Sequence, residues 1–265
     1  MVEAPHDPVA VVTGGAAGIG EAVSLHLART GYTVVALDRD EAGLDRLLVQ
    51  ADAEGLGIEG IPVDVSIEAQ LSAAAAQVAE RHGSVATLVC AAGIQRYGTV
   101  DGTSMATFDE VMNVNVRGVF GACHYFIPLI RARGAGAVVV VASVQAYATQ
   151  NGVAAYSASK GALLSLVKAM AVDHAAEGIR VNAVCPGSVD TPMLRWAAER
   201  FGDGRATGDV VAEWGRAHPM GRVASAAEVA SAVAYLAGPD ASFVTGADLK
   251  VDGGLTAALN VALPE

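Results

Sequence analysis

One segment constrains the fold of this chain more than any other, the glycine-rich turn Thr13-Gly14-Gly15-Ala16-Ala17-Gly18-Ile19-Gly20. The apolar, β-branched residues 9–12 before it predict a buried strand, and residues 21–30 after it predict a helix that ends at Gly31. Strand, glycine turn and helix in this order are typical of a dinucleotide-binding unit, because the glycines let a pyrophosphate approach the positive end of the helix. A tight turn without a ligand is the alternative interpretation.

The residue that ends the next predicted strand indicates which dinucleotide is preferred. Residues 32–37 form that strand, and Asp38 follows Gly20 by 18 positions. A carboxylate at this place accepts hydrogen bonds from the adenosine ribose hydroxyls and repels a 2′-phosphate. Ala17 adds no cation that would bind a phosphate, whereas Arg39 can stack on adenine or reach one. We therefore predict NAD as the cofactor, in preference to NADP.

Strand and helix signals alternate along almost the whole chain. The further predicted helices are 41–53, 67–82, 105–116, 119–132, 154–177 and 226–236, and the further strands are 57–64, 87–90, 137–143, 179–184 and 249–251. This alternation predicts an α/β fold, a Rossmann-type doubly wound parallel sheet with helices on both faces. Since no repeat or linker divides the 265 residues, we expect a single domain over 1–265, with 1–7 flexible.

The charge balance excludes some classes of partner. The chain has 28 acidic and 17 basic side chains and a formal net charge of −11, which argues against nucleic acid or an anionic membrane. Residues 1–8 lack the pattern of a secretory signal, and the apolar run 135–142 is too short to span a bilayer. We expect a cytoplasmic protein that acts on a small molecule.

The residues that commonly bind metals are scattered. Cys90, Cys123 and Cys185 have neither paired nor metal-like spacing, so small buried apolar roles in a reducing compartment are expected for them. His124, Asp190 and His218 do not form a ligand cluster. We predict no catalytic metal.

A tyrosine and a lysine supply the clearest candidates for chemistry. Lys160 follows Tyr156 by four positions within a predicted helix, so both side chains lie on one helix face. A cation beside a phenol favours the phenolate and lowers the phenol pKa from about 10, which allows proton exchange near neutral pH. The pair alone is weak evidence, because Lys160 could equally be a solvated surface charge.

In combination, these motifs resemble the single-domain branch of the short-chain dehydrogenase/reductase family. The resemblance runs from about Pro8 to Gly254, through the cofactor turn, the Tyr-x-x-x-Lys pair and the late Val251-Asp252-Gly253-Gly254. It implies a catalytic set of Asn115, Ser143, Tyr156 and Lys160. Taken singly, Ser143 could be an ordinary strand-end hydroxyl, and Asn115 a helix kink or cap.

The resemblance also implies roles for these residues. Tyr156 would be the general acid/base, and Lys160 would lower its pKa and hold the nicotinamide ribose. Ser143 would bind the substrate oxygen, and Asn115 would hold a water next to Lys160. Cofactor contacts are implied for Gly14, Ala17, Gly18, Ile19, Gly20, Asp38, Arg39, Asp64, Val65, Ala92, Gly93, Tyr156, Lys160, Pro186, Gly187, Val189 and Thr191.

One motif departs from the family pattern. The family usually has Asn-Asn-Ala-Gly after the fourth strand, where this chain has Cys90-Ala91-Ala92-Gly93. Those Asn side chains mostly brace the sheet, so we expect altered packing around Cys90 rather than altered chemistry.

The substrate is less constrained by the sequence. Pocket residues are expected at Gln95, Gln145, Gln150, Ser188 and Trp196. The long stretch 188–221 is interpreted as a substrate lid, or alternatively as a pair of surface helices at a subunit contact. The polar residues suit a sugar or a small polar alcohol, whereas the aromatic residues of the lid suit a cyclic alcohol or steroid.

The predicted function is hydride transfer between a secondary alcohol and NAD. One alternative is a 3-oxoacyl reductase acting on acyl carrier protein or coenzyme A thioesters, which the Asp38 carboxylate and the acidic surface disfavour. The other is a catalytically silent NAD-binding sensor or scaffold, which the intact Ser143, Tyr156 and Lys160 disfavour. Family resemblance further implies a homotetramer.

Overall fold

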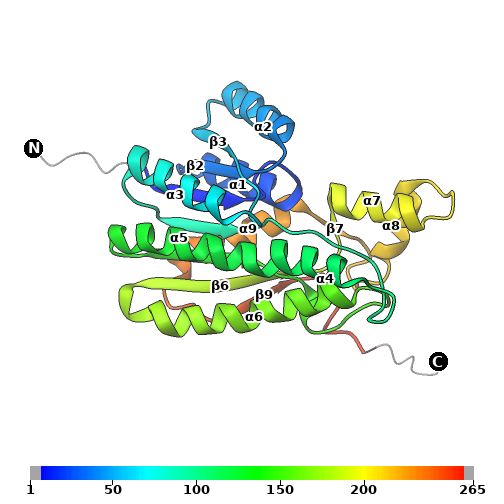
Figure 1. Cartoon of the computed structure of the whole chain (residues 1–265). Helices are drawn as coiled ribbons and strands as arrows, with labels where there is room; N and C mark the ends of the chain where they lie inside the picture. The colour runs from blue at the N-terminus through cyan, green and yellow to red at the C-terminus, as the bar shows by residue number, and fades with distance from the viewer. Residues whose placement is uncertain (1–6, 260–265) are drawn as a thin grey trace, which may run out of the picture.

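A parallel sheet of seven strands forms the centre of the molecule, which the computed structural model describes over residues 7–259. The expected flexibility of residues 1–7 thus falls almost wholly outside the described residues. The strands are β1 (Val9–Thr13), β2 (Thr33–Asp38), β3 (Ile58–Pro62), β4 (Thr87–Cys90), β5 (Gly136–Val141), β6 (Ile179–Pro186) and β9 (Asp248–Val251). They lie in the order β3-β2-β1-β4-β5-β6-β9 (Figure 1), as predicted for a doubly wound sheet.

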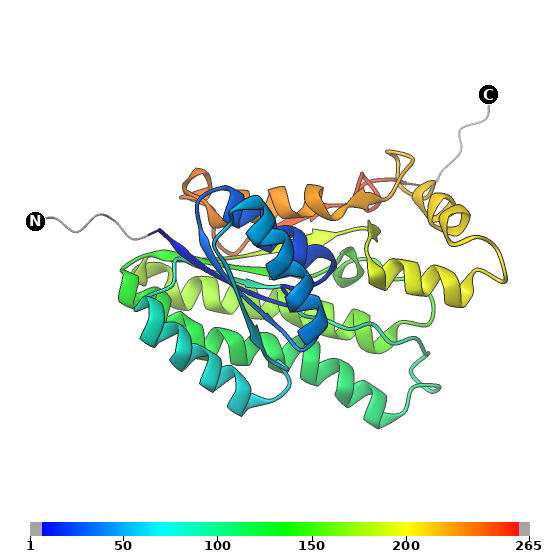
Figure 2. The same cartoon turned by 90° about the horizontal axis from the view of Figure 1, so that it is seen from above.

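Helices cover both faces of the sheet, as Figure 2 shows from above. One face carries α3 (Glu68–His82), α5 (Gly118–Arg133) and α6 (Ala154–His174), and the other carries α1 (Gly18–Arg29), α2 (Glu41–Glu54) and α9 (Ala226–Ala237). Alternate strand residues serve the two layers: Val138 and Val140 pack toward α5 and α6, while Val139 packs toward α1 and α9. Strands buried on both faces in this way explain the continuous valine runs of the sequence.

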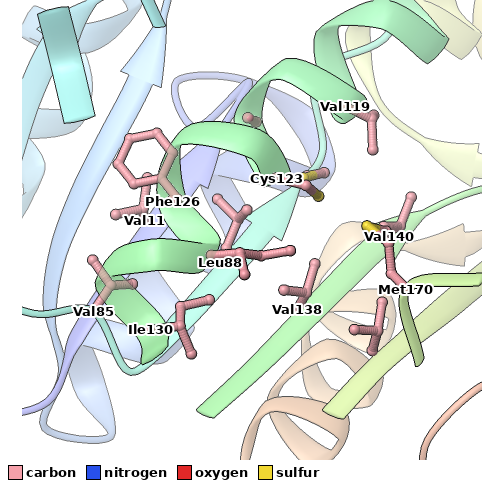
Figure 3. Packing of buried hydrophobic residues seen from close by; sticks show 14 of the residues in the cluster. Val11, Val85, Leu88, Val119, Cys123, Phe126, Ile130, Val138, Val140 and Met170 are labelled. Atoms are coloured by element: carbon pink, nitrogen blue, oxygen red, sulfur yellow. The ribbon is translucent and has the colours of Figure 1, made fainter. Parts of the chain in front are cut away.

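The core on the α5 side is built around Phe126 and Ile130, which are fully buried against Leu88 and Val138 (Figure 3). Cys90 lies in the same cluster, next to Cys123 on α5. Contact with Cys123 and burial raise the pKa of the Cys90 thiol well above its usual value. Where the family usually has an Asn, this chain thus has a small thiol that contacts the Cys123 thiol within an apolar cluster.

The predicted break between two helices near residue 118 is wrong. Helix α4 (Met105–Met112) continues through a π-helical turn, Asn113–Arg117, directly into α5. Gly118 has helical backbone angles, so it does not end the helix. A Cβ at this position would lie 2.8 Å from a methyl group of Val65. The glycine therefore lets the helix approach the loop after β3.

The segment 188–221 folds into two short helices at one end of the molecule, α7 (Pro192–Phe201) and α8 (Thr207–Gly215). The short strand β7 (Val189–Asp190) precedes them and pairs with β8 (Ala224–Ser225). Thr191 begins α7, since its hydroxyl accepts a hydrogen bond from the Leu194 N–H and Pro192 occupies the first helical position. Within residues 7–259, no helix is long and apolar enough to cross a membrane.

Candidate active site

The carboxyl ends of β4, β5 and β6 open into a cavity of about 700 Å³. Ser143 lies just beyond β5, and Tyr156 and Lys160 lie on the first two turns of α6. All three line this cavity and are nearly buried, with exposed fractions of 8%, 8% and 5%. The spacing in the sequence thus brings a hydroxyl, a phenol and an ammonium to one place.

Lys160 is held below the phenol by the sheet. Its Nζ donates to the carbonyl oxygen of Val141 over 2.9 Å and lies 5.5 Å from the centre of the Tyr156 ring. Burial lowers the pKa of Lys160 to about 8, because little water remains to solvate the ammonium. The side chain is not a solvated surface charge.

Burial acts in the opposite direction on Tyr156. It raises the pKa of Tyr156 to about 12, against a lowering effect of the hydrogen bond with Ser143. The sequence analysis expected Lys160 to lower the Tyr156 pKa, but in the protein alone the pKa is raised. The loss of hydration of the phenol outweighs the lowering effect of Ser143, and the Lys160 ammonium lies over the ring.

Asn115 lies in the π-helical turn and is fully buried behind the cavity. Its Oδ1 accepts from the Ile94 N–H over 2.8 Å, and its Nδ2 donates to the Ile94 carbonyl at 2.9 Å and to Ser159 Oγ at 3.0 Å. Ser159 Oγ in turn donates to the Tyr156 carbonyl. The Asn115 side chain is thus used to join the loop after β4 to the catalytic end of α6.

The glycine turn lies beside this cavity with its backbone closely packed. A Cβ on Gly14, whose φ is +66°, would lie 2.7 Å from the Ala92 backbone, and one on Gly20 would lie 1.9 Å from the Gly14 carbonyl oxygen. Helix α1 has no side-chain cap, and its first intrahelical bond is donated by Glu21. The N–H groups of residues 18–20 therefore remain available to an anion.

Asp38 ends β2 next to this turn. Its two carboxylate oxygens accept from the Ala16 N–H and the Asp40 N–H, each over 3.0 Å. A carboxylate has about four acceptor positions, so two remain for ribose hydroxyls. The Asp38 side chain thus both fixes the glycine turn and offers the acceptors that NAD requires.

The other residues with predicted cofactor contacts divide into two groups. Those that line the cavity are Ile19, Gly93, Pro186, Gly187, Val189 and Thr191. Those that lie outside it are Ala17, Gly18, Arg39, Asp64 and Val65, on the β1–β3 side of the sheet or at the glycine turn, and Ala92, in the loop after β4. Asp64 accepts hydrogen bonds from the N–H and hydroxyl of Ser66, which lower its pKa despite partial burial.

Four of the five predicted substrate residues line the cavity, namely Gln95, Gln145, Gln150 and Ser188. Trp196 is not among the lining residues; it is 46% exposed and stacks on Tyr97, which does line the cavity, so its contact with substrate stays a prediction. Helix periodicity explains the difference: Met193, Ala197 and Phe201 share the face of α7 toward the cavity, and Trp196 lies on the adjacent face.

The cavity lining also includes Leu255 and Thr256, which the sequence analysis does not predict, and His218, to which it gives no role in the site. His218 is buried, and its Nε2 accepts from the Ser188 N–H at 3.1 Å while its Nδ1 faces the Trp214 carbonyl at 3.2 Å. These contacts require the neutral ring with its proton on Nδ1. His218 follows α8 and contacts Ser188, 30 positions earlier in the chain, so no pattern in the local sequence predicts this contact.

Titratable residues do not gather into a metal-ligand set anywhere in residues 7–259, where no group of three His, Cys, Asp or Glu side chains has suitable geometry. The absence of a catalytic metal remains a prediction.

Comparison with known proteins supports the relationship implied by the motifs. A family model described as enoyl-(acyl carrier protein) reductase matches residues 14–256. The chain is 39% identical to 2-(R)-hydroxypropyl-CoM dehydrogenase of Xanthobacter autotrophicus, over 94% of this chain and 98% of the relative. It is also 39% identical to galactitol 2-dehydrogenase (L-tagatose-forming) of Cereibacter sphaeroides, over 93% of this chain and 94% of the relative.

Solved structures share the fold at similar identity. Ligand-free aldohexose dehydrogenase of Thermoplasma acidophilum superposes with a TM-score of 0.90 at 35% identity, over 98% of both chains. An actinorhodin polyketide ketoreductase variant with NADPH superposes with a TM-score of 0.89 at 35% identity, over 94% of this chain and 97% of the other.

Proposed function

The chain belongs to the short-chain dehydrogenase/reductase family, and we propose that it is an NAD-dependent dehydrogenase of secondary alcohols that uses Tyr156 as its acid/base. One observation carries the proposal. Ser143, Tyr156 and Lys160 converge, nearly buried, on one cavity beside a glycine turn that fits a dinucleotide. Sugar and alcohol dehydrogenases among the relatives support the same reaction class.

The residues present fit a nicotinamide dinucleotide. Gly14 and Gly20 leave no room for side chains at the turn, and the uncapped N-terminus of α1 faces the space where a pyrophosphate would lie. When bound, the nicotinamide ring accepts a hydride from the alcohol carbon or returns it to the carbonyl. Lys160 would hold the ribose hydroxyls and Asp38 those of the adenosine.

The protein's own groups handle the proton and the substrate oxygen. Tyr156 would take the hydroxyl proton as the alcohol is oxidised and return it during reduction. Ser143, which lines the same cavity as Tyr156, would hold the substrate oxygen within reach of the phenol. Asn115 would act through the Ile94 loop and Ser159, since its side-chain atoms are already engaged there, and not through a direct contact with substrate.

The test of this mechanism is Tyr156→Phe. This variant should lose turnover of every alcohol tested, while NAD still quenches protein fluorescence with an unchanged Kd. Turnover at the wild-type rate would refute the role of Tyr156. NAD binding without turnover by the wild type on any alcohol would instead favour the silent sensor.

The preference for NAD rests on Asp38. Two of its acceptor positions remain for ribose hydroxyls, and its charge opposes a 2′-phosphate. Asp38→Ala should therefore lower kcat/KM with NAD and raise that with NADP, so that the NAD/NADP ratio falls about 100-fold. An unchanged NAD/NADP ratio would contradict the role of Asp38 in the preference for NAD. The actinorhodin polyketide ketoreductase with NADPH would then be the better basis for predicting the cofactor.

The acyl reductase remains the second candidate, since the family model is described by an acyl carrier protein substrate. Two further expectations complete the proposal: a cytoplasmic homotetramer, and a lid formed by residues 188–221. Exposed apolar residues such as Phe120 and Val172, on α5 and α6, suit subunit contacts. A monomer in sedimentation would contradict the tetramer.

A further inference from the structure

The cavity wall is almost uncharged. Of the described residues that line it, Lys160 is the one with a charged side chain, and its ammonium already donates to the Val141 carbonyl. No Asp, Glu or Arg of residues 7–259 contributes to the lining. His218 is held as a neutral ring by Ser188 and Trp214. The Arg200 guanidinium lies 5.6 Å from the centre of the Phe201 ring but is not among the lining residues. With Lys160 assigned to the nicotinamide ribose, a carboxylate or phosphate buried here would find no further cation in the cavity lining, which is unfavourable.

One part of the cavity lining is apolar. Tyr97 meets Phe201 edge to face, with ring centres 4.6 Å apart, and Leu194, Trp214 and Leu255 extend the same wall. Such a surface stabilises a hydrocarbon skeleton.

Another part of the lining carries an amide with a fixed orientation. Gln145 Oε1 lies 3.3 Å from the hydroxyls of both Thr149 and Ser157, which lie 2.5 Å apart from each other. Within the described residues, the Gln145 Nε2 has no hydrogen-bond partner, although the side chain is half-buried and lines the cavity. The Gln145 Nε2 is therefore free to donate to an acceptor on a ligand in the cavity.

Gln145 is also close to the reaction centre. Its backbone N–H donates to Ser143 Oγ over 3.1 Å, and Ser157, which contacts its side chain, follows Tyr156 directly in α6. The residue that carries the free amide donor therefore neighbours Ser143, which would hold the reacting oxygen together with Tyr156.

From these three features we infer that the substrate is an uncharged secondary alcohol with a second oxygen on the neighbouring carbon, bound by the Gln145 amide, and a hydrocarbon side that packs on Tyr97 and Phe201. Gln145 is thereby a specificity-determining residue. The inference rests on the proposed function, since it requires the reacting oxygen to lie at Ser143 and Tyr156.

The experiment uses three ring alcohols that differ only next to the reacting carbon: cyclohexanol, cyclohexane-1,2-diol and 2-hydroxycyclohexanecarboxylate, each as cis and trans isomers where these exist. NAD reduction is followed by absorbance of the reduced nicotinamide. We expect kcat/KM for the better diol isomer to exceed that for cyclohexanol about tenfold, as one hydrogen bond provides. The carboxylate should fall at least about 100-fold below the diol.

Gln145→Met keeps the length of the side chain and removes its donors, so the diol-to-cyclohexanol ratio should fall from about 10 to about 1. Gln50→Met, on exposed α2, is the matched control and should keep the wild-type ratio. Equal values for diol and cyclohexanol in the wild type, a ratio unchanged by Gln145→Met, or a preferred carboxylate would each overturn the inference.

The outcomes separate this inference from the proposed function. If the ring alcohols are inert while another secondary alcohol is oxidised in a Tyr156-dependent way, the inference fails and the proposed function stands. If no alcohol of any class is oxidised, both fail.

Discussion

The buried ammonium of Lys160 gives a stability prediction that does not depend on the reaction. Burial lowers its pKa from 10.5 to about 8. Each unit of this shift corresponds to 1.36 kcal/mol, so the charged ammonium destabilises the folded state by about 3 kcal/mol. This holds below about pH 8, where Lys160 is charged in both the folded and the unfolded protein. Lys160→Met removes this term, but it leaves the Val141 carbonyl without its donor, which costs about 1 kcal/mol.

The sign of the effect therefore changes with pH. The folded-state pKa of Lys160 lies below its unfolded value, so between about pH 8 and 10.5 the contribution of Lys160 to the free energy of unfolding rises. We expect Lys160→Met to be more stable than the wild type by about 2 kcal/mol at pH 7 and less stable by about 1 kcal/mol at pH 10.5. Cys185 and Tyr156, whose ordinary pKa values are 9.0 and 10.0, lower the stability of both proteins in this window, so the difference between variant and wild type is the quantity that isolates Lys160.

Urea unfolding of the cofactor-free protein, followed by circular dichroism at several pH values from 7 to 10.5, measures this difference. Lys168→Met, on an exposed position of the same helix, is the matched control and should give a difference that does not vary with pH. A Lys160→Met variant that is less stable at pH 7, or a difference that runs parallel to the control, would refute the argument from burial.

Two further predictions concern single buried positions. Thr87→Val should raise the free energy of unfolding by about 1 kcal/mol, because Thr87 Oγ1 is buried without a partner within the described residues and valine has the same shape. A lower urea midpoint would show that the hydroxyl is hydrogen-bonded after all. Gly20→Ala should abolish NAD binding in a fluorescence titration, because the new Cβ would lie 1.9 Å from the Gly14 carbonyl oxygen. Gly161→Ala, where a Cβ meets nothing within 4 Å, should bind NAD normally, and equal binding by both variants would contradict the role given to the turn.

The sheet and its site-bearing ends were predictable because local signals and tertiary structure agree there. Valine runs set the strands, and Gly14 and Asp38 follow β1 and β2 directly, so parallel pairing brings them to one edge. The spacing between Tyr156 and Lys160 likewise fixes one helix face.

The differences arise where one residue type has two structural uses. The predicted helices 105–116 and 119–132 leave Gly118 between them, yet this glycine serves close approach to Val65 within a continuous helix. Trp196 is an aromatic residue of the predicted lid, yet α7, which begins after Thr191, directs Ala197 to the cavity and leaves Trp196 outside the lining. The contact of Gly118 with Val65 is distant in sequence, and the side of α7 that meets the cavity is set by the fold, so local patterns resolve neither.

The Tyr156 pKa shows most clearly why a motif does not determine electrostatics. Four-residue spacing predicts proximity of cation and phenol, but the balance between attraction and lost hydration depends on burial, which only the fold supplies. Burial wins here, and the phenol pKa rises to about 12. A neutral phenol is a competent proton donor for carbonyl reduction, whereas alcohol oxidation near neutral pH requires further stabilisation of the phenolate. The protein alone thus holds Tyr156 as an acid, and its use as a base would require a further group, such as a bound ligand, that stabilises the phenolate.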